Sequence, residues 1–297
     1  MMSTGHHLTA AVGLYLSLLA SVVDARSLSI MVTNDDGFQA PGIVAVAAAL
    51  RAAGYRVTVV APRADQSGSS VKISLQPLPF KEESPGVWAV DGSPADAVNV
   101  GLGVILGKQP PDLVVSGTNR GQNLGSTSNL SGTVGAAIMA AIHDVPAIAV
   151  SAGIDFKEAK QGFPSTAAAY PEAAKFVVKM VAALAAEQGG PLLPTRTLLN
   201  VNYPALAQNE IKGARWTTVG PGSGYAISYQ VDSTKGTAKL AFGPDTGREP
   251  VESNTDTARF AQGYITVSAL QASWQSARTA EIAPRVSSLV APETPGG

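Results

Sequence analysis

The stretch "SIMVTNDDGFQAPG", from Ser29 to Gly42, decides the fold of this 297-residue chain. It begins with an apolar run typical of a buried strand, and Pro41 is placed to open a helix. Two adjacent carboxylates, Asp35 and Asp36, lie between the strand and the helix. Their mutual repulsion and their desolvation both cost free energy, so this strand–helix connection requires a compensating partner.

The same alternation of apolar run and helical pattern continues along the chain. Further strands are predicted at "RVTVVAP" (56–62), "VWAVDG" (87–92), "DLVVSG" (112–117), "AIAVS" (147–151) and "TLLNVNYP" (197–204). Near-continuous apolar strands joined by helices imply a parallel sheet that is covered on both faces. We therefore predict a doubly wound α/β fold with a mostly parallel sheet.

Helix boundaries can be placed from capping residues. The first helix starts at Pro41 and is closed by Gly54, and the second has Ser93 as its N-cap. A third helix is predicted over 131–144, in which His143 is interpreted as a C-terminal cap, and a fourth over about 165–186.

The sequence pattern changes at about Lys212. Turn-rich segments such as "GYAISYQVDST" (224–234) and "GTAKLAFGPD" (236–245) replace the alternating pattern. They predict hairpins in a C-terminal β-rich appendage over about 212–270, rather than a continuation of the core. The tail 285–297 carries no motif, and we expect it to be disordered.

Composition excludes several classes of function. With 45% hydrophobic residues the chain can bury one large core, and its net charge of −1 gives no reason to expect nucleic acid as a partner. The absence of cysteine excludes disulfides, zinc–thiolate sites and a cysteine nucleophile. Of three histidines, only His143 lies beyond the N-terminal segment, so two histidine ligands cannot come from one mature chain.

Residues 1–25 are predicted to be an export signal. The apolar stretch "LTAAVGLYLSLLASVV" is followed by small residues suited to cleavage after Ala25. We therefore expect a periplasmic or secreted protein that does not interact with a membrane once the signal is removed. A retained membrane anchor is the alternative, although the run is short for a bilayer span.

Polar side chains gather where the predicted strands end. In an open α/β sheet the ligand site lies outside the carboxyl ends of the strands. The small oxygen-bearing residues at those ends suit hard divalent cations such as Mg²⁺, Mn²⁺ or Ca²⁺. They are Asp35, Asp36, Asp65, Gln66, Ser67, Asp91, Ser93, Ser116, Thr118 and Asn119.

A bound divalent ion would offset the repulsion between Asp35 and Asp36. Taken separately, "NDDG" and "DQSG" are typical of turns, and "SGTNRGQNLG" of a polar loop. The expected convergence of the three loops on one edge of the sheet favours the metal site.

The motifs also resemble, in order, those of the SurE family of survival-protein nucleotidases. The resemblance covers about 29–270, with gaps after Asp155 and between Trp216 and Asn254. The motifs that carry it are "VTNDDGFQAPG", "VVAPRADQSGSS", "AVDGSPADAV", "PDLVVSGTNRGQNLG", "LSGTVGAA", "PAIAVS", "LNVNYP" and "TDTARFAQGYITVSAL".

This resemblance implies a Rossmann-like core and a metal-dependent phosphomonoesterase that acts on nucleoside 5′- and 3′-monophosphates. It implies a homodimer or homotetramer that uses the β-rich segment for assembly, and one divalent metal ion, Mg²⁺ or Mn²⁺, with Ca²⁺ possible in crystals. The implied metal ligands are Asp35, Asp36, Ser67 and Asn119. The implied substrate-phosphate side consists of Asn34, Asn123, Ser131, Gly132 and Thr133.

The start of the third helix supports the phosphate assignment independently, because a Ser-Gly-Thr N-terminus presents free amides and hydroxyls to an anion. We expect the metal and the helix dipole to be the main catalytic elements. Water activated by the metal is the expected nucleophile, with Asp36 or Asp35 as general base. Direct attack by a carboxylate is the alternative.

Other functions stay open beside this one. A broad-specificity acid phosphatase and a non-catalytic nucleotide- or metal-binding module both fit the same residues. A phospho-aspartate phosphatase is disfavoured because the carboxylates are adjacent, and a serine hydrolase because no G-x-S-x-G motif occurs. The stretch "STSNLSG" (126–132) departs from the more acidic or aromatic family pattern, and we expect it to alter the pocket wall near Ser131.

Overall fold

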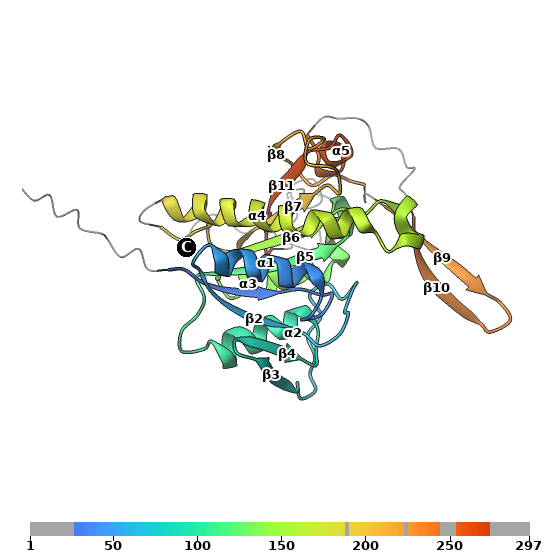
Figure 1. Ribbon diagram of the computed structural model, residues 1–297. Helices are drawn as coiled ribbons and strands as arrows, with labels where there is room; N and C mark the ends of the chain where they lie inside the picture. The colour runs from blue at the N-terminus through green and yellow to red at the C-terminus, as the bar shows by residue number, and fades with distance from the viewer. Residues whose placement is uncertain (1–26, 188–189, 223–224, 244–253, 274–297) are drawn as a thin grey trace, which may run out of the picture.

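The computed structural model of the chain describes residues 27–187, 190–222, 225–243 and 254–273. Helices cover both faces of one large sheet, and a two-stranded hairpin projects from the body (Figure 1). The doubly wound α/β fold predicted from the alternating pattern is confirmed. The predictions for 1–25 and 285–297 lie outside the described residues, so export stays a prediction that rests on sequence.

Nine strands of the described residues form the central sheet, and most neighbours run parallel. The exceptions are the pair at one edge and the contact between Thr197–Tyr203 and Ile265–Gln271, which are antiparallel. In sheet order the strands are β3 (Phe80–Ser84), β4 (Val87–Val90), β2 (Arg56–Pro62), β1 (Ser29–Thr33), β5 (Leu113–Arg120), β6 (Ala147–Ala152), β7 (Thr197–Tyr203), β11 (Ile265–Gln271) and β8 (Ala214–Trp216).

The long helices divide between the two faces of the sheet. Helices α1 (Pro41–Ala52) and α4 (Pro164–Ala186) pack on one face, and α2 (Pro94–Val100) and α3 (Gly132–Ile142) pack on the other. Shorter helical segments connect these elements: η1 (Gly101–Ile105), η2 (Gly125–Leu130), η3 (Phe156–Gln161) and α5 (Asp256–Ala261). Within the described residues no helix is both long enough and apolar enough to cross a membrane.

Strand β1 shows why the strands are almost continuously apolar. Ile30 and Val32 are buried in the core beneath α1 and α4, whereas Met31 is buried in the core beneath α2 and α3. Successive side chains of a strand point to opposite faces, so a strand covered on both sides needs an apolar residue at every position. Each such side chain contributes about 1.5–3 kcal/mol when it is fully buried.

The predicted helix starts are confirmed. Pro41 is the first residue of α1, and Ser131 is the N-cap of α3. At the start of α2, Ser93 and Asp96 form a reciprocal capping box, in which each side chain accepts a hydrogen bond from the other residue's backbone amide. His143 lies at the C-cap of α3, as expected.

The C-terminal β-rich region is divided differently from the prediction. Only β9 (Ala226–Asp232) and β10 (Thr237–Gly243) form the projecting hairpin, whereas β8 and β11 join the central sheet. The reason is burial, because Ile265 and Val267 of β11 pack into the core beneath α4, while the hairpin side chains are largely exposed. Strand β3 was not predicted, since its residues "FKEES" are all exposed and lack an apolar pattern.

Candidate metal and phosphate site

The carboxylate pair lies directly after β1, near the middle of the central sheet. Asp35 is buried, with 3% of its surface exposed, and Asp36 is half-buried. The neighbouring strands β2 and β5 run parallel to β1, so the loops that follow them reach the same edge of the sheet. The predicted convergence of these loops is therefore present in the fold.

The start of α3 packs directly against Asp35. The Thr133 hydroxyl donates a 2.5 Å hydrogen bond to Oδ1 of Asp35. A Cβ atom added at Gly132 would lie 2.8 Å from Cβ and 2.9 Å from Oδ2 of Asp35, closer than real Cβ contacts allow. Glycine at this position thus lets the helix N-terminus approach the carboxylate.

Asp36 is held by the last residue of β5. The backbone amide of Arg120 donates a 3.0 Å hydrogen bond to Oδ2 of Asp36. Asn119, the residue before it, is buried, and its side-chain amide donates to the carbonyl of Gly121 at 2.7 Å. The predicted ligand Asn119 therefore lies next in the chain to the residue that holds Asp36.

The loop after β2 is tied to the same place through its backbone. The amide of Gln66 donates to the carbonyl of Asp35 at 2.8 Å. The next residue, Ser67, is exposed. Its backbone amide donates a 2.8 Å hydrogen bond to Oδ1 of Asp65. Ser67 is therefore positioned by a turn that is anchored beside Asp35.

Burial governs the protonation of the pair. It raises the pKa of Asp35 from 3.8 to about 6, with the charge of Asp36 adding to the rise and the Thr133 hydroxyl opposing it. Burial also raises the pKa of Asp36, and Arg120 opposes that rise. The charge of Asp65 raises both pKa values. Two carboxylates thus share a site whose protein surroundings stabilise their negative charge incompletely.

The residues around the pair fit a hard divalent cation. Several buried side-chain oxygens at this edge have no hydrogen-bond partner among the described residues: Asn34 Oδ1, Ser69 Oγ, Ser116 Oγ and Thr118 Oγ1. The donor set is entirely oxygen, as hard cations prefer. Since the described residues contain no cluster of three or more His, Cys, Asp or Glu, neutral oxygens would have to complete the coordination.

Besides Thr133, three of the predicted phosphate residues have structural hydrogen bonds. The side-chain amide of Asn34 donates to the carbonyl of Gly37 at 2.9 Å. Ser131 Oγ accepts from the amide of Val134 at 3.1 Å, which makes it the cap of α3. The side-chain amide of Asn123 donates to Ser151 Oγ at 2.9 Å, and its backbone amide donates to Asn202 Oδ1 at 2.7 Å. Asn123 is thus anchored to β6 and β7.

Some residues of the site were not assigned a role from sequence. Arg120 acts through its backbone amide, which no side-chain pattern reveals. The sequence predicted Asp65 at the end of a strand, but it did not indicate that the charge of Asp65 raises the pKa of Asp35. Ser69 lies in the motif "DQSGSS". Its Oγ would be 2.8 Å from a Cβ atom added at Gly132, and this tertiary contact is what identifies Ser69 as a residue of the site.

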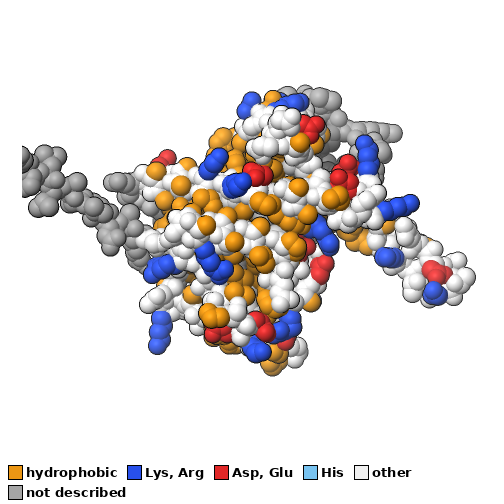
Figure 2. Space-filling model, viewed as in Figure 1, with side chains coloured by type: hydrophobic (Ala, Val, Ile, Leu, Met, Phe, Trp, Pro, Cys, Tyr) orange, Lys and Arg blue, Asp and Glu red, His pale blue; other side chains and the backbone are white. Residues whose placement is uncertain are grey.

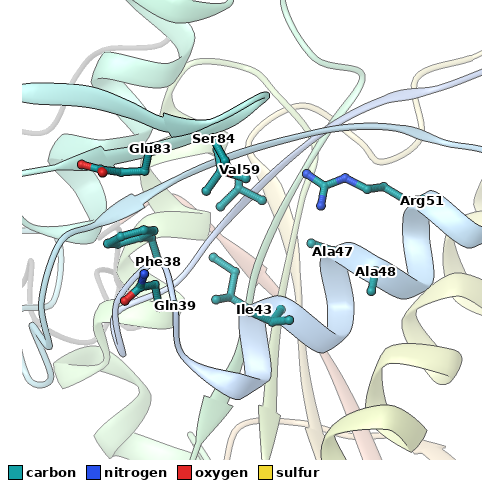
Figure 3. A pocket seen from close by; sticks show the side chains of 11 residues that line it. Phe38, Gln39, Ile43, Ala47, Ala48, Arg51, Val59, Glu83 and Ser84 are labelled. Atoms are coloured by element: carbon teal, nitrogen blue, oxygen red, sulfur yellow. The ribbon is translucent and has the colours of Figure 1, made fainter.

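A separate cavity of about 480 Å³ lies between α1 and the edge strands β3 and β4 (Figure 3). None of the predicted site residues lines it. Its lining is mostly apolar and includes Phe38, Ile43, Val59 and Val87. The lining also includes Arg51 and Glu83 but no pair of carboxylates that could hold a cation, so the carboxylate pair and not this cavity is the candidate site.

In this doubly wound sheet a helix N-terminus packs against Asp35 of the carboxylate pair. That arrangement is typical of α/β proteins that hold a divalent cation beside an anion. The family model described as "Survival protein SurE" matches residues 30–224. The chain belongs to the SurE family.

Relatives and a solved structure agree with this assignment. The chain is 45% identical over 194 residues to 5′-nucleotidase SurE of Geobacter sulfurreducens, covering 65% of this chain and 68% of the relative. It is 35% identical over 245 residues to 5′-nucleotidase SurE of Alkalilimnicola ehrlichii, covering 82% of this chain and 89% of the relative. The crystal structure of the SurE protein from Aquifex aeolicus matches with a TM-score of 0.71 and 31% identity, covering 88% of this chain and 99% of that chain.

Replacing Gly132 tests the fit between α3 and Asp35. In Gly132→Ala the new Cβ displaces the Asp35 carboxylate, and we expect the affinity for Mg²⁺ or Mn²⁺ to fall about ten- to hundredfold, as when outer-shell partners are lost. Calorimetric titration of the purified protein measures this. Gly103→Ala is the matched control, since nothing lies within 4 Å of a Cβ at that position. Unchanged affinity in folded Gly132→Ala would contradict the prediction.

Replacing Asp35 tests the electrostatic cost of the buried carboxylate. Because its folded-state pKa is raised, the metal-free protein loses stability as pH rises from about 4 to about 6. The rise from 3.8 to about 6 corresponds to at most about 3 kcal/mol. We expect Asp35→Asn with EDTA to have a higher free energy of unfolding than wild type at pH 7 and an equal one near pH 4.

Urea unfolding of both proteins at the two pH values measures this difference, and excess Mg²⁺ should reduce it at pH 7. A difference of the same size at both pH values would show that the carboxylate charge is not its cause.

Proposed function

We propose that this protein is a metal-dependent phosphomonoesterase that hydrolyses nucleoside 5′-monophosphates, and also 3′-monophosphates, to a nucleoside and phosphate. The observation that carries the proposal is the direct packing of the α3 N-terminus against Asp35, the buried member of the carboxylate pair. The relatives named 5′-nucleotidase SurE support a nucleotide as substrate.

The helix start supplies groups that bind a phosphate. The amide of Val134 is capped by Ser131 Oγ, and the amide of Gly135 donates to the carbonyl of Ser131. Within the described part of the chain the amides of Gly132 and Thr133 have no hydrogen-bond partner and could bind an anion, and the helix dipole favours negative charge at this end.

Asp35, Asp36, Ser67 and Asn119 would hold the divalent cation, Mg²⁺ or Mn²⁺. Bound there, the ion supplies positive charge that stabilises the charge developing on the phosphate oxygens. Two hydrogen bonds fix the orientation of the carboxylates that would hold the cation, because Thr133 donates to Oδ1 of Asp35 and the amide of Arg120 donates to Oδ2 of Asp36.

The same carboxylates provide a general base. Water attacks phosphorus, its proton passes to a carboxylate oxygen of Asp36 or Asp35, and the bond from phosphorus to the nucleoside oxygen breaks. The nucleoside oxygen then takes up a proton. Without the cation, burial raises the pKa of both groups, and a bound divalent cation opposes that rise.

Phosphate release from a panel of nucleoside monophosphates and an aryl phosphate tests the proposal. We expect EDTA to abolish release, Mg²⁺ or Mn²⁺ to restore it, and Asp36→Asn to lower kcat by roughly 10²-fold or more. Asp144→Asn is the control, since Asp144 is an exposed carboxylate away from the pair.

Each alternative predicts a distinct result. No release from folded wild-type protein with either metal would contradict the proposal and favour a non-catalytic binding module. Preferred hydrolysis of phosphoesters without a base would favour a broad-specificity phosphatase.

We also propose that the hairpin assembles the protein into a homodimer or homotetramer. Antiparallel pairing places Ile227 opposite Phe242 and Tyr229 opposite Leu240, so these exposed apolar side chains share one face. The hairpin stands clear of the body (Figure 2), and an isolated two-stranded hairpin is marginally stable in water. A second copy that covers this face would stabilise it.

Light scattering of Val231→Lys tests this assembly. Val231 is 72% exposed on the apolar face, and a lysine there should reduce the molar mass toward that of a monomer. Gln230→Lys puts the same charge on the opposite face and should leave the mass unchanged. Equal masses for wild type and Val231→Lys would argue against assembly through this face.

A further inference from the structure

A segment from the C-terminal half of the chain contacts the loop that leads to α3. The amide of Ser126 in η2 donates to the carbonyl of Gly222 at 2.9 Å. A Cβ added at Gly125 would lie only 1.7 Å from the same oxygen. The backbone around Gly222 is therefore in direct contact with η2, just before the helix start that touches Asp35.

Asp256 fixes this contact. It is fully buried at the start of α5. Its Oδ2 accepts from the amide of Gly125 at 2.9 Å, and its Oδ1 accepts from the amide of Gly220 at 2.8 Å. One carboxylate thus joins η2 to the segment that carries the hairpin.

Tyr225, at the base of the hairpin, faces η2 as a result. Its hydroxyl shares a hydrogen bond with the side chain of Thr127 in η2. Its ring meets the Phe242 ring edge-on, with centroids 5.3 Å apart and an interplanar angle of 90°. The residue is half-buried, so its position is defined on one side while part of its surface stays open.

Tyr225 also lies within the electrostatic reach of the carboxylate pair. Burial raises its pKa, the hydrogen bond to Thr127 opposes that rise, and the charge of Asp35 adds to it. η2 ends at Leu130, and the residues that contact Asp35, Gly132 and Thr133, follow within three positions, so the ring lies near the phosphate side of the site.

We propose that the Tyr225 ring is the surface on which the nucleotide base stacks, and that it makes the site prefer nucleotides to phosphate esters without a base. The inference rests on the function proposed above. Stacking on an aromatic ring tolerates every base, because every base has a π face. Removing such a ring lowers affinity by roughly ten- to a hundredfold for the stacked base.

Hydrolysis of AMP and of ribose 5-phosphate, which lacks only the base, tests the proposal. For Tyr225→Ala we expect kcat/KM for AMP to fall at least about tenfold, mainly through KM, with ribose 5-phosphate changed less than about twofold. Tyr225→Phe keeps the ring and should retain the wild-type ratio. Equal losses for both substrates, or no loss for AMP, would overturn the proposal.

Gln230→Ala removes a side chain from the opposite face of β9, the strand that follows Tyr225, and should leave the AMP to ribose 5-phosphate ratio unchanged. If it reproduces the change seen in Tyr225→Ala, the effect belongs to the hairpin as a whole and the proposal fails.

Calorimetric binding of AMP and ribose 5-phosphate separates this inference from the proposed function. If the wild-type protein releases no phosphate, the proposed function fails. A selective loss of AMP binding in Tyr225→Ala would still support the stacking surface, and its absence would overturn it.

Discussion

Two adjacent carboxylates held at the end of a buried central strand are the constraint on which the site depends. Like charges in a poorly solvated position cost free energy, and burial raises the pKa of both Asp35 and Asp36. The surrounding structure offsets this cost in part. Thr133 donates to one carboxylate and the backbone of Arg120 donates to the other, so the start of α3 and the end of β5 orient the pair.

The rest of the fold brings these two elements together. Parallel pairing of β1 with β2 and β5 places three strand ends at one edge, and the absence of a side chain at Gly132 lets a helix N-terminus approach Asp35. The result is a site with negative charge on one side and a positive dipole end on the other. A cation and a phosphate monoester together satisfy both sides, which explains why the proposed reaction needs a metal.

The second feature of the molecule is the C-terminal segment that returns to the site. Asp256 links the loop before α3 to the segment that carries the hairpin, so the proposed assembly surface and the proposed base-stacking ring belong to one structural unit.

Local sequence was enough to define the doubly wound class, the helix starts at Pro41, Ser93 and Ser131, and the candidate carboxylates. These follow from periodicity and capping, which adjacent residues encode. The folded chain was needed to show that β11 joins the sheet beside β7, that the Arg120 amide holds Asp36, and that Asn123 is anchored to β6 and β7. It was needed equally to show that Tyr225 lies against η2. Each of these contacts joins residues distant in the chain or acts through the backbone, and packing of the whole fold creates them.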